Sequence, residues 1–183
     1  MKKYILPVSL AIVLSLWVAY SNTVSTMVFN EGIKYKGRVC VSYKDADTGT
    51  WKDLGCSSNL ITDIGKEFVE DQLTNPQTAN TTKYISLSNT STSPSASWTK
   101  LPDEFTSLGL SRAECTIMDM GTGQFNCTHT FTATGSANNV NVAGLNWNGA
   151  SDSEGNLFAA ATFTSTNLEA NDMISVIWII QIS

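Results

Sequence analysis

The stretch Met173-Ile174-Ser175-Val176-Ile177-Trp178-Ile179-Ile180-Gln181-Ile182 decides the expected fold. Successive side chains of a β-strand point to opposite faces, so one face of this stretch carries Ile174, Val176, Trp178, Ile180 and Ile182. Met173, Ile177 and Ile179 make the second face largely apolar as well. A strand that is apolar on both faces has to be covered on both. We therefore predict that residues 173–182 form the central strand of a sheet, with both faces covered.

Shorter alternating segments before this strand predict further antiparallel strands. Residues 39–43 and 50–54 flank an Asp/Gly turn, and residues 113–120 and 124–134 flank Gly121-Thr122-Gly123, so each pair predicts a hairpin. Further strands are predicted at residues 83–88, 139–147 and 157–166. A helix is predicted at residues 62–74, capped by Thr62 or Asp63. The fold class is therefore mainly all-β: an antiparallel β-sandwich or jelly roll of about eight strands with one short inserted helix.

The four cysteines allow three pairings, and the turns favour one of them. Cys40 and Cys56 lie almost symmetrically about the first turn, and Cys115 and Cys127 about the second. If both turns close hairpins, each pair faces itself across two strands, which predicts the disulfides Cys40–Cys56 and Cys115–Cys127. A zinc site built from four thiolates is the alternative, but the C-x2-C spacing typical of such sites is absent.

The first residues combine a positive start, Met1-Lys2-Lys3, with an apolar run to Tyr20. Small residues at Ala19 and Ser21 favour a signal peptide, residues 1–21, cleaved before Asn22. A retained membrane-anchor helix is the alternative, since the run is close to the length that spans a bilayer. Residues 22–183 then form a single extracellular β-sandwich domain, secreted or held at the cell surface. A net charge of -5 without a basic stripe argues against nucleic acid as a partner.

Asp45-Ala46-Asp47-Thr48-Gly49 has the acidic spacing that opens a calcium loop. Asp45 and Asp47 are therefore weak candidate metal ligands, and calcium is the one cofactor considered. The loop lacks both a third ligand before the glycine and a distal glutamate. A simple hairpin turn that uses Asp and Gly for their backbone tolerance explains the same residues.

No residue pattern indicates an enzyme. His129 is the only histidine, the cysteines are assigned to disulfides, and no G-x-S-x-G motif occurs. Carboxylate pairs such as Glu67 with Glu70 resemble an ordinary solvated helix face. We expect a non-enzymatic protein with no catalytic residues.

Three sequons for N-glycosylation occur, at Asn80, Asn89 and Asn126. Asn80 and Asn89 fall in predicted loop or strand-edge positions, so a glycoprotein with sugar at these two sites is the weak expectation. Asn126 neighbours a cysteine assigned to a disulfide and is the least suitable of the three.

The order of elements resembles uncharacterised exported β-sandwich proteins of archaea and their viruses, and through them phage tail and virion appendage domains. The residues that carry this resemblance are Asn59–Lys66, Tyr84–Ser88, Ala143-Gly144-Leu145 and the closing strand after Asn171-Asp172. The resemblance implies a structural or adhesive β-domain and assigns no functional residue. The export signal and the disulfides depart from typical tail proteins and favour a surface or envelope location.

The sequence therefore predicts a structural or adhesive subunit of an extracellular assembly, either a cell-surface filament or layer or a virion surface protein. The expected partners are further copies or other surface or virion proteins, with membrane contact only through an uncleaved N-terminal segment. Residues 24–36 either add as a strand to a neighbour, form the first strand of their own sandwich, or act as a stalk. The alternative is a secreted or membrane-anchored module that binds glycan or calcium, with Trp51, Trp98 or Trp147 as a stacking face.

Overall fold

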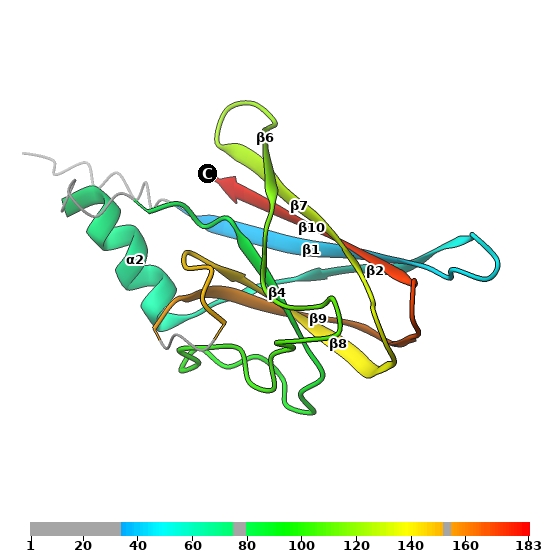
Figure 1. The fold of residues 1–183 in the computed structure, drawn as a ribbon. Helices are drawn as coiled ribbons and strands as arrows, with labels where there is room; N and C mark the ends of the chain where they lie inside the picture. The colour runs from blue at the N-terminus through cyan, green and yellow to red at the C-terminus, as the bar shows by residue number, and fades with distance from the viewer. Residues whose placement is uncertain (1–33, 75–79, 152–154) are drawn as a thin grey trace, which may run out of the picture. The chain divides into compact units, whose positions relative to one another are not determined.

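The computed structural model describes residues 34–74, 80–151 and 155–183. Five strands form sheet A, in the order β2 (Trp51–Ser58), β1 (Tyr35–Lys44), β10 (Met173–Ile182), β7 (Gln124–Thr132) and β6 (Thr116–Asp119). β10 lies in the middle, between β1 and β7, and pairs antiparallel with both (Figure 1). The prediction of a central last strand is therefore confirmed.

The other five strands form sheet B, in the order β3 (Leu60–Ile61), β9 (Leu157–Leu168), β8 (Ala137–Asn146), β4 (Tyr84–Ser88) and β5 (Ala113–Glu114). All pairings in both sheets are antiparallel. With one helix, α2 (Asp63–Thr74), these sheets confirm the predicted all-β sandwich.

The described residues form ten strands where about eight are expected, and one added strand marks a change of sheet. The segment 113–120, expected as one strand, contributes β5 to sheet B and β6 to sheet A, with Cys115 between them. The chain thus passes from one layer to the other at a cysteine. Alternation in the sequence is continuous through this point, so it does not reveal the break.

The core lies between the two sheets. β10 contributes Ile174, Val176, Trp178 and Ile180, of which Trp178 is fully buried. Sheet B faces them with small and branched side chains, including Leu87, Ala143, Leu145, Ala159 and Ala161. Alanines on β9 leave room for the large indole opposite, as close packing requires.

Sheet B is covered on its outer face by the chain itself. Leu101 packs with Val142, Leu157 and Ala160 in a second cluster, and Trp98 and Ile64 lie against it. The segment after β4 is also fixed by backbone hydrogen bonds, among them Asp63 N–H to Ala96 O at 2.8 Å. The Ser/Thr-rich run 89–99 therefore belongs to a segment that closes one side of the sandwich.

Helix α2 begins at a threonine cap and lies very close to β9. The Thr62 hydroxyl accepts a hydrogen bond from Gly65 N–H at 3.0 Å, so Thr62 is the cap rather than Asp63. A Cβ at residue 65 would collide with the carbonyl oxygen of Phe158. Gly65 lowers helix propensity, but it is the residue that permits this approach.

The outer face of sheet A is not covered by any described segment. Ile177 and Ile179 of β10 are half-buried and belong to neither core cluster. The expectation that both faces of β10 are covered is therefore wrong within the described residues. The one long segment available for covering, residues 89–112, packs on sheet B instead.

β1 starts where β10 stops. Lys34 and Ser183 exchange two backbone hydrogen bonds, with N–O distances of 2.6 and 3.0 Å. Residues 34–36 of the segment 24–36 thus extend the first strand of the same sandwich. The expected signal or anchor, residues 1–21, lies outside the described residues. Among the residues described, no helix is long and apolar enough to span a bilayer.

Candidate functional site: the open face of sheet A

Both expected disulfides form, and they lie in different environments. Cys40 and Cys56 stand directly opposite each other on β1 and β2, with a Cα–Cα distance of 4.0 Å. Cys115 and Cys127 join the sheet-crossing point to β7, with a Cα–Cα distance of 5.4 Å, and both are buried. No cysteine is free. The two disulfides indicate an oxidising environment.

We call the outward side of sheet A the open face. The strand register identifies its residues. Ile177 pairs with Cys40 on β1 and Thr128 on β7, and Ile179 pairs with Arg38 and Asn126 on the same two strands. Its other members are mostly polar, with two methionines and one tryptophan: Lys36, Ser42, Lys44, Trp51, Asp53, Ser58, Thr116, Met118, Gln124, Thr130, Met173, Ser175 and Gln181. The open face is therefore an aliphatic centre within a hydroxyl- and amide-rich surround.

Two shallow hollows mark the open face. One of 440 Å³ is lined by Ile177, Met118, Asn126 and the threonines of β6 and β7. The other, of 320 Å³, is lined by Ile179, Lys36, Arg38, Gln124 and Gln181. Their lining includes cations and neutral polar groups but no carboxylate, so it offers hydrogen bonds and apolar contact rather than paired acids and bases.

The open face ends at an exposed edge strand. β6 pairs with β7 alone, and all four of its residues are exposed. Met118 is 59% exposed and Ile117 46% exposed. An apolar edge with unpaired backbone groups is a template for a further strand.

The candidate calcium ligands form a turn. The Asp45 carboxylate accepts hydrogen bonds at 3.0 Å from the backbone N–H groups of Asp47 and Thr48, and Gly49 takes a φ of 66°. This is the geometry expected of a simple hairpin turn, the alternative to a calcium loop. Within the described residues, no three Asp, Glu, His or Cys side chains are grouped so as to hold a metal ion.

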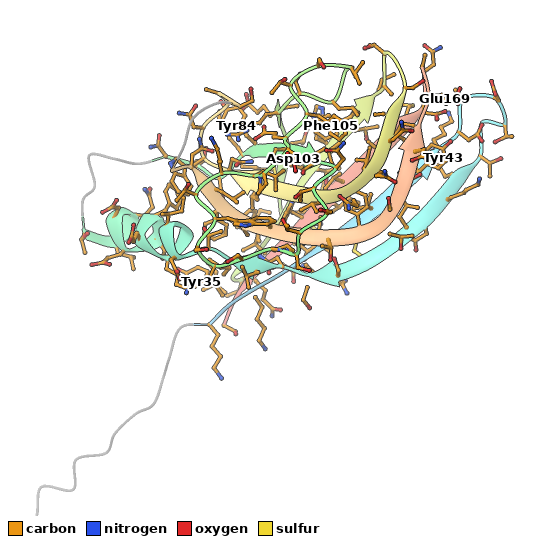
Figure 2. All side chains as sticks on the ribbon, turned by 90° about the horizontal axis from the view of Figure 1, so that it is seen from below. Tyr35, Tyr43, Tyr84, Asp103, Phe105 and Glu169 are labelled. Carbon is orange, nitrogen blue, oxygen red and sulfur yellow. A yellow bond between two sulfur atoms is a disulfide. The ribbon has the colours of Figure 1, made fainter. Side chains whose placement is uncertain are left out.

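Asp172 links the β1–β2 turn to the β9–β10 turn at one end of the sandwich. It is buried and accepts hydrogen bonds from Ala46 N–H and Glu169 N–H, both at 2.8 Å, and from the Tyr43 hydroxyl at 3.1 Å. Figure 2 shows Tyr43 and Glu169 together at this end. Burial alone would raise the pKa of Asp172, but the three donors outweigh it and hold the pKa below its ordinary value. Burial, and then Asp172, raise the pKa of Tyr43 to about 12.

We expect Asp172→Asn to destabilise the protein by about 1 to 3 kcal/mol at pH 7, because it weakens buried charge-assisted hydrogen bonds. A carboxylate with a depressed folded pKa stabilises above its unfolded pKa, and that stability is lost as the pH falls through the folded value. The difference in free energy of unfolding between parent and variant should therefore shrink as the pH falls below 3.8, the ordinary pKa of an aspartate. Urea unfolding at pH 7 and at stepwise lower pH measures this difference, with the exposed Asp47→Asn variant as control. A gap that stays constant with pH would contradict this assignment.

A buried ion pair joins Glu104 to Arg112. Glu104 forms two hydrogen bonds with Arg112, at 2.9 Å to Nε and 2.6 Å to Nη2. Arg112 Nη1 also donates to Asn148 O at 2.8 Å and to Asn156 Oδ1 at 2.6 Å. Arg112 thus joins Glu104 to the β8–β9 connection.

His129 and the tryptophans are mostly engaged in packing. The His129 ring contacts Phe131 edge to face at 4.5 Å between centroids, and its Nδ1 lies 2.9 Å from Glu114 O. Trp147 stacks on Phe68 of α2 at 4.5 Å, beside a groove of 410 Å³ that also includes Glu67 and Asp71. Trp98 packs on sheet B, whereas Trp51 is 47% exposed.

Two of the three sequon asparagines are accessible. Asn80 and Asn89 are exposed, whereas Asn126 is half-buried in β7 with its Oδ1 buried and without a hydrogen-bond partner. Glycosylation of Asn80 and Asn89 stays a prediction.

Comparisons of this chain with protein-family models, with curated proteins and with solved structures found no match.

Sequence reasoning missed the open face and the Arg112 network. One signal for the open face was present, because Met173, Ile177 and Ile179 make the second side of β10 apolar. Which sheet receives the covering segment is a tertiary outcome that alternation does not encode. Nothing local distinguishes Arg112 from an exposed arginine.

Proposed function

We propose that this protein is a non-enzymatic structural or adhesive subunit of an extracellular assembly. The proposal covers a cell-surface filament or layer and, following the resemblance of its elements, a virion surface. Export through residues 1–21 and self-association or contact with other surface proteins are parts of the same proposal.

The observation that carries it is the asymmetry between the two sheets. Sheet B has both faces covered, by sheet A and by the segment with Trp98 and Leu101. Among the residues that the structure describes, only one face of sheet A is covered, and its open face carries half-buried Ile177 and Ile179 beside exposed Met118. Unpartnered apolar surface next to a free strand edge is a feature of protein interaction sites.

The chemistry of the open face also suits protein contact. Its surround of Thr, Ser, Asn and Gln side chains offers hydrogen bonds at low desolvation cost, as the rim of an interface requires. The disulfide Cys40–Cys56 lies in the same face opposite Ile177 and holds β2 to β1. A rigid sheet that needs no rearrangement is suited to repeated subunit contacts.

Negative-stain microscopy of the protein isolated from its natural source tests the proposal. Filaments, lattices or particles that contain the chain are the expected result. A monomer at all accessible concentrations that is retained by immobilised glycans would contradict it and favour the alternative, a ligand-binding module. The groove beside Trp147, with Glu67 and Asp71 at its wall, is the observation that favours this second function.

We expect Met118→Asp to weaken assembly about tenfold, because it places a charge in an apolar contact. Met118 is 59% exposed, so the melting temperature should be nearly unchanged. Sedimentation velocity over a concentration series measures the effect. Thr81→Asp adds the same charge at an exposed position outside both sheets and should assemble like the parent. Equal assembly of both variants would exclude the open face as the contact.

A further inference from the structure

We infer that the open face receives helix α2 of a second copy, so that copies join head to tail in an open chain. This inference rests on the proposed function and names the contact within it. Three features carry it: a basic strip on the open face, exposed carboxylates on α2, and an apolar residue on each surface that is not fully buried by the described part of the chain.

The basic strip lies on β1. Lys34, Lys36 and Arg38 alternate along the chain, and Arg38 pairs with Ile179, which places the strip on the open face. All three residues are exposed, and none forms an ion pair within the described residues. Lys36 and Arg38 line the hollow that also contains Ile179. The strip therefore presents unneutralised positive charge beside apolar surface.

The acidic side belongs to α2. Glu67, Glu70 and Asp71 are exposed, and no basic residue is present in the last turn. Carboxylates near a helix C-terminus are disfavoured by the helix dipole. Cations from a neighbouring molecule would offset that cost. Leu73, one turn after Glu70, is 74% exposed.

The two surfaces match in size and pattern. A helix of 12 residues is about 18 Å long, and the 10 residues of β1 extend about 33 Å, so a helix laid along β1 fits on the open face. Glu67 and Glu70 stand one turn apart, about 5 to 6 Å between Cβ atoms, and Lys36 and Arg38 are separated by about 7 Å along β1. A helix laid on the open face therefore brings both carboxylates to the basic strip while Leu73 reaches the Ile177 and Ile179 surface.

The two surfaces lie on different parts of the sandwich. α2 lies at one end of the strands, where Ile64 packs on the second cluster and Phe68 and Val69 on the core between the sheets, whereas the open face is the outer side of sheet A (Figure 1). One molecule can therefore offer its helix and receive another at the same time. Contacts between two different surfaces do not close by symmetry in a pair, so they generate an open chain or a ring.

Two charge-reversal variants of the exported protein test the contact. Lys36→Glu/Arg38→Glu makes the open face acidic, and Glu67→Lys/Glu70→Lys makes the helix basic. Each variant alone brings like charges together and should associate about a hundredfold more weakly than the parent in sedimentation velocity. An equimolar mixture restores opposite charges at every contact, so it should assemble again. Lys52→Glu/Lys100→Glu changes the net charge equally at two exposed positions outside the open face and α2, and should assemble like the parent.

Three results would overturn the inference. The first is a reversed variant that assembles as the parent does; the assembly would then be built through other surfaces, and the proposed function would stand. The second is a mixture that stays dissociated although both variants keep the parental melting temperature. The third is a basic-strip variant that loses binding to anionic lipid vesicles without any change in association, which would assign the strip to a membrane. A parent that never assembles contradicts the proposed function itself.

Discussion

A chain that lacks residues 178–183 is expected not to fold. The deletion removes Trp178 and Ile180 from the core, and burial of each is worth about 1.5 to 3 kcal/mol. It also removes the strand partner of the first half of β1 and of the start of β7, because both pair with this part of β10. These losses together reach the entire stability of a typical domain, about 5 to 15 kcal/mol. Circular dichroism and thermal melting measure the result.

Point substitutions at Trp178 and Ile182 test how much single side chains of β10 contribute to stability. Trp178→Ala should cost about 3 to 5 kcal/mol through the cavity it leaves, and Trp178→Phe should cost less. The Trp178 Nε1 atom is buried without a hydrogen-bond partner, so phenylalanine removes no hydrogen bond. Ile182→Ser, at a residue 41% exposed, should change stability by less than about 0.5 kcal/mol. A truncated protein that is soluble and melts cooperatively would contradict the central role of β10.

The Arg112→Met variant should lose about 3 to 5 kcal/mol of stability, because it leaves the buried Glu104 carboxylate without its partner. The two side chains are only 1% and 5% exposed. Burial raises the pKa of Glu104, and the Arg112 guanidinium acts in the opposite direction. Removal of the guanidinium therefore leaves desolvation of the carboxylate unopposed. Equilibrium unfolding in urea at pH 7 measures the change.

Two further variants distinguish the cost of leaving a buried charge unpaired from the cost of simply losing a charge. The double variant Arg112→Met/Glu104→Leu removes both charges and should recover part of the loss, since no buried charge is left unpaired. Lys83→Met breaks the pair with Glu114, whose side chains are 35% and 57% exposed, and should cost less than about 1 kcal/mol. Equal costs for Arg112→Met and Lys83→Met would show that burial of the Arg112 pair adds nothing.

The parts of the fold that depend on local pattern are those that the sequence predicted. Alternation and turn residues locate both hairpins, and the hairpins bring Cys40 to Cys56 and Cys115 to Cys127. The run of β-branched and aromatic residues in 173–182 indicates a central strand because few other positions tolerate so much apolar surface. These features require only neighbouring residues and elementary strand geometry.

The parts that depend on distant packing were not predicted. The passage from β5 to β6 at Cys115 changes sheet without any change in alternation. Gly65 carries a penalty in a helix considered alone, and only the position of Phe158 explains it. The open face exists because residues 89–112 pack on sheet B, which is a choice between two similar surfaces. Such choices are decided by the whole core and leave no local signature.

The adjacency of Lys34 and Ser183 has a mechanical consequence. A load applied between these two residues would separate β1 from β10 at their shared end and break one backbone pair at a time. Unzipping of this kind needs little force per step, whereas sliding two long strands past each other requires many bonds to break together. A load applied across the two layers would instead be resisted by the side-chain packing between the sheets, and the Cys40–Cys56 disulfide resists separation of β1 from β2 within sheet A, so the direction of pull decides how strongly the molecule resists.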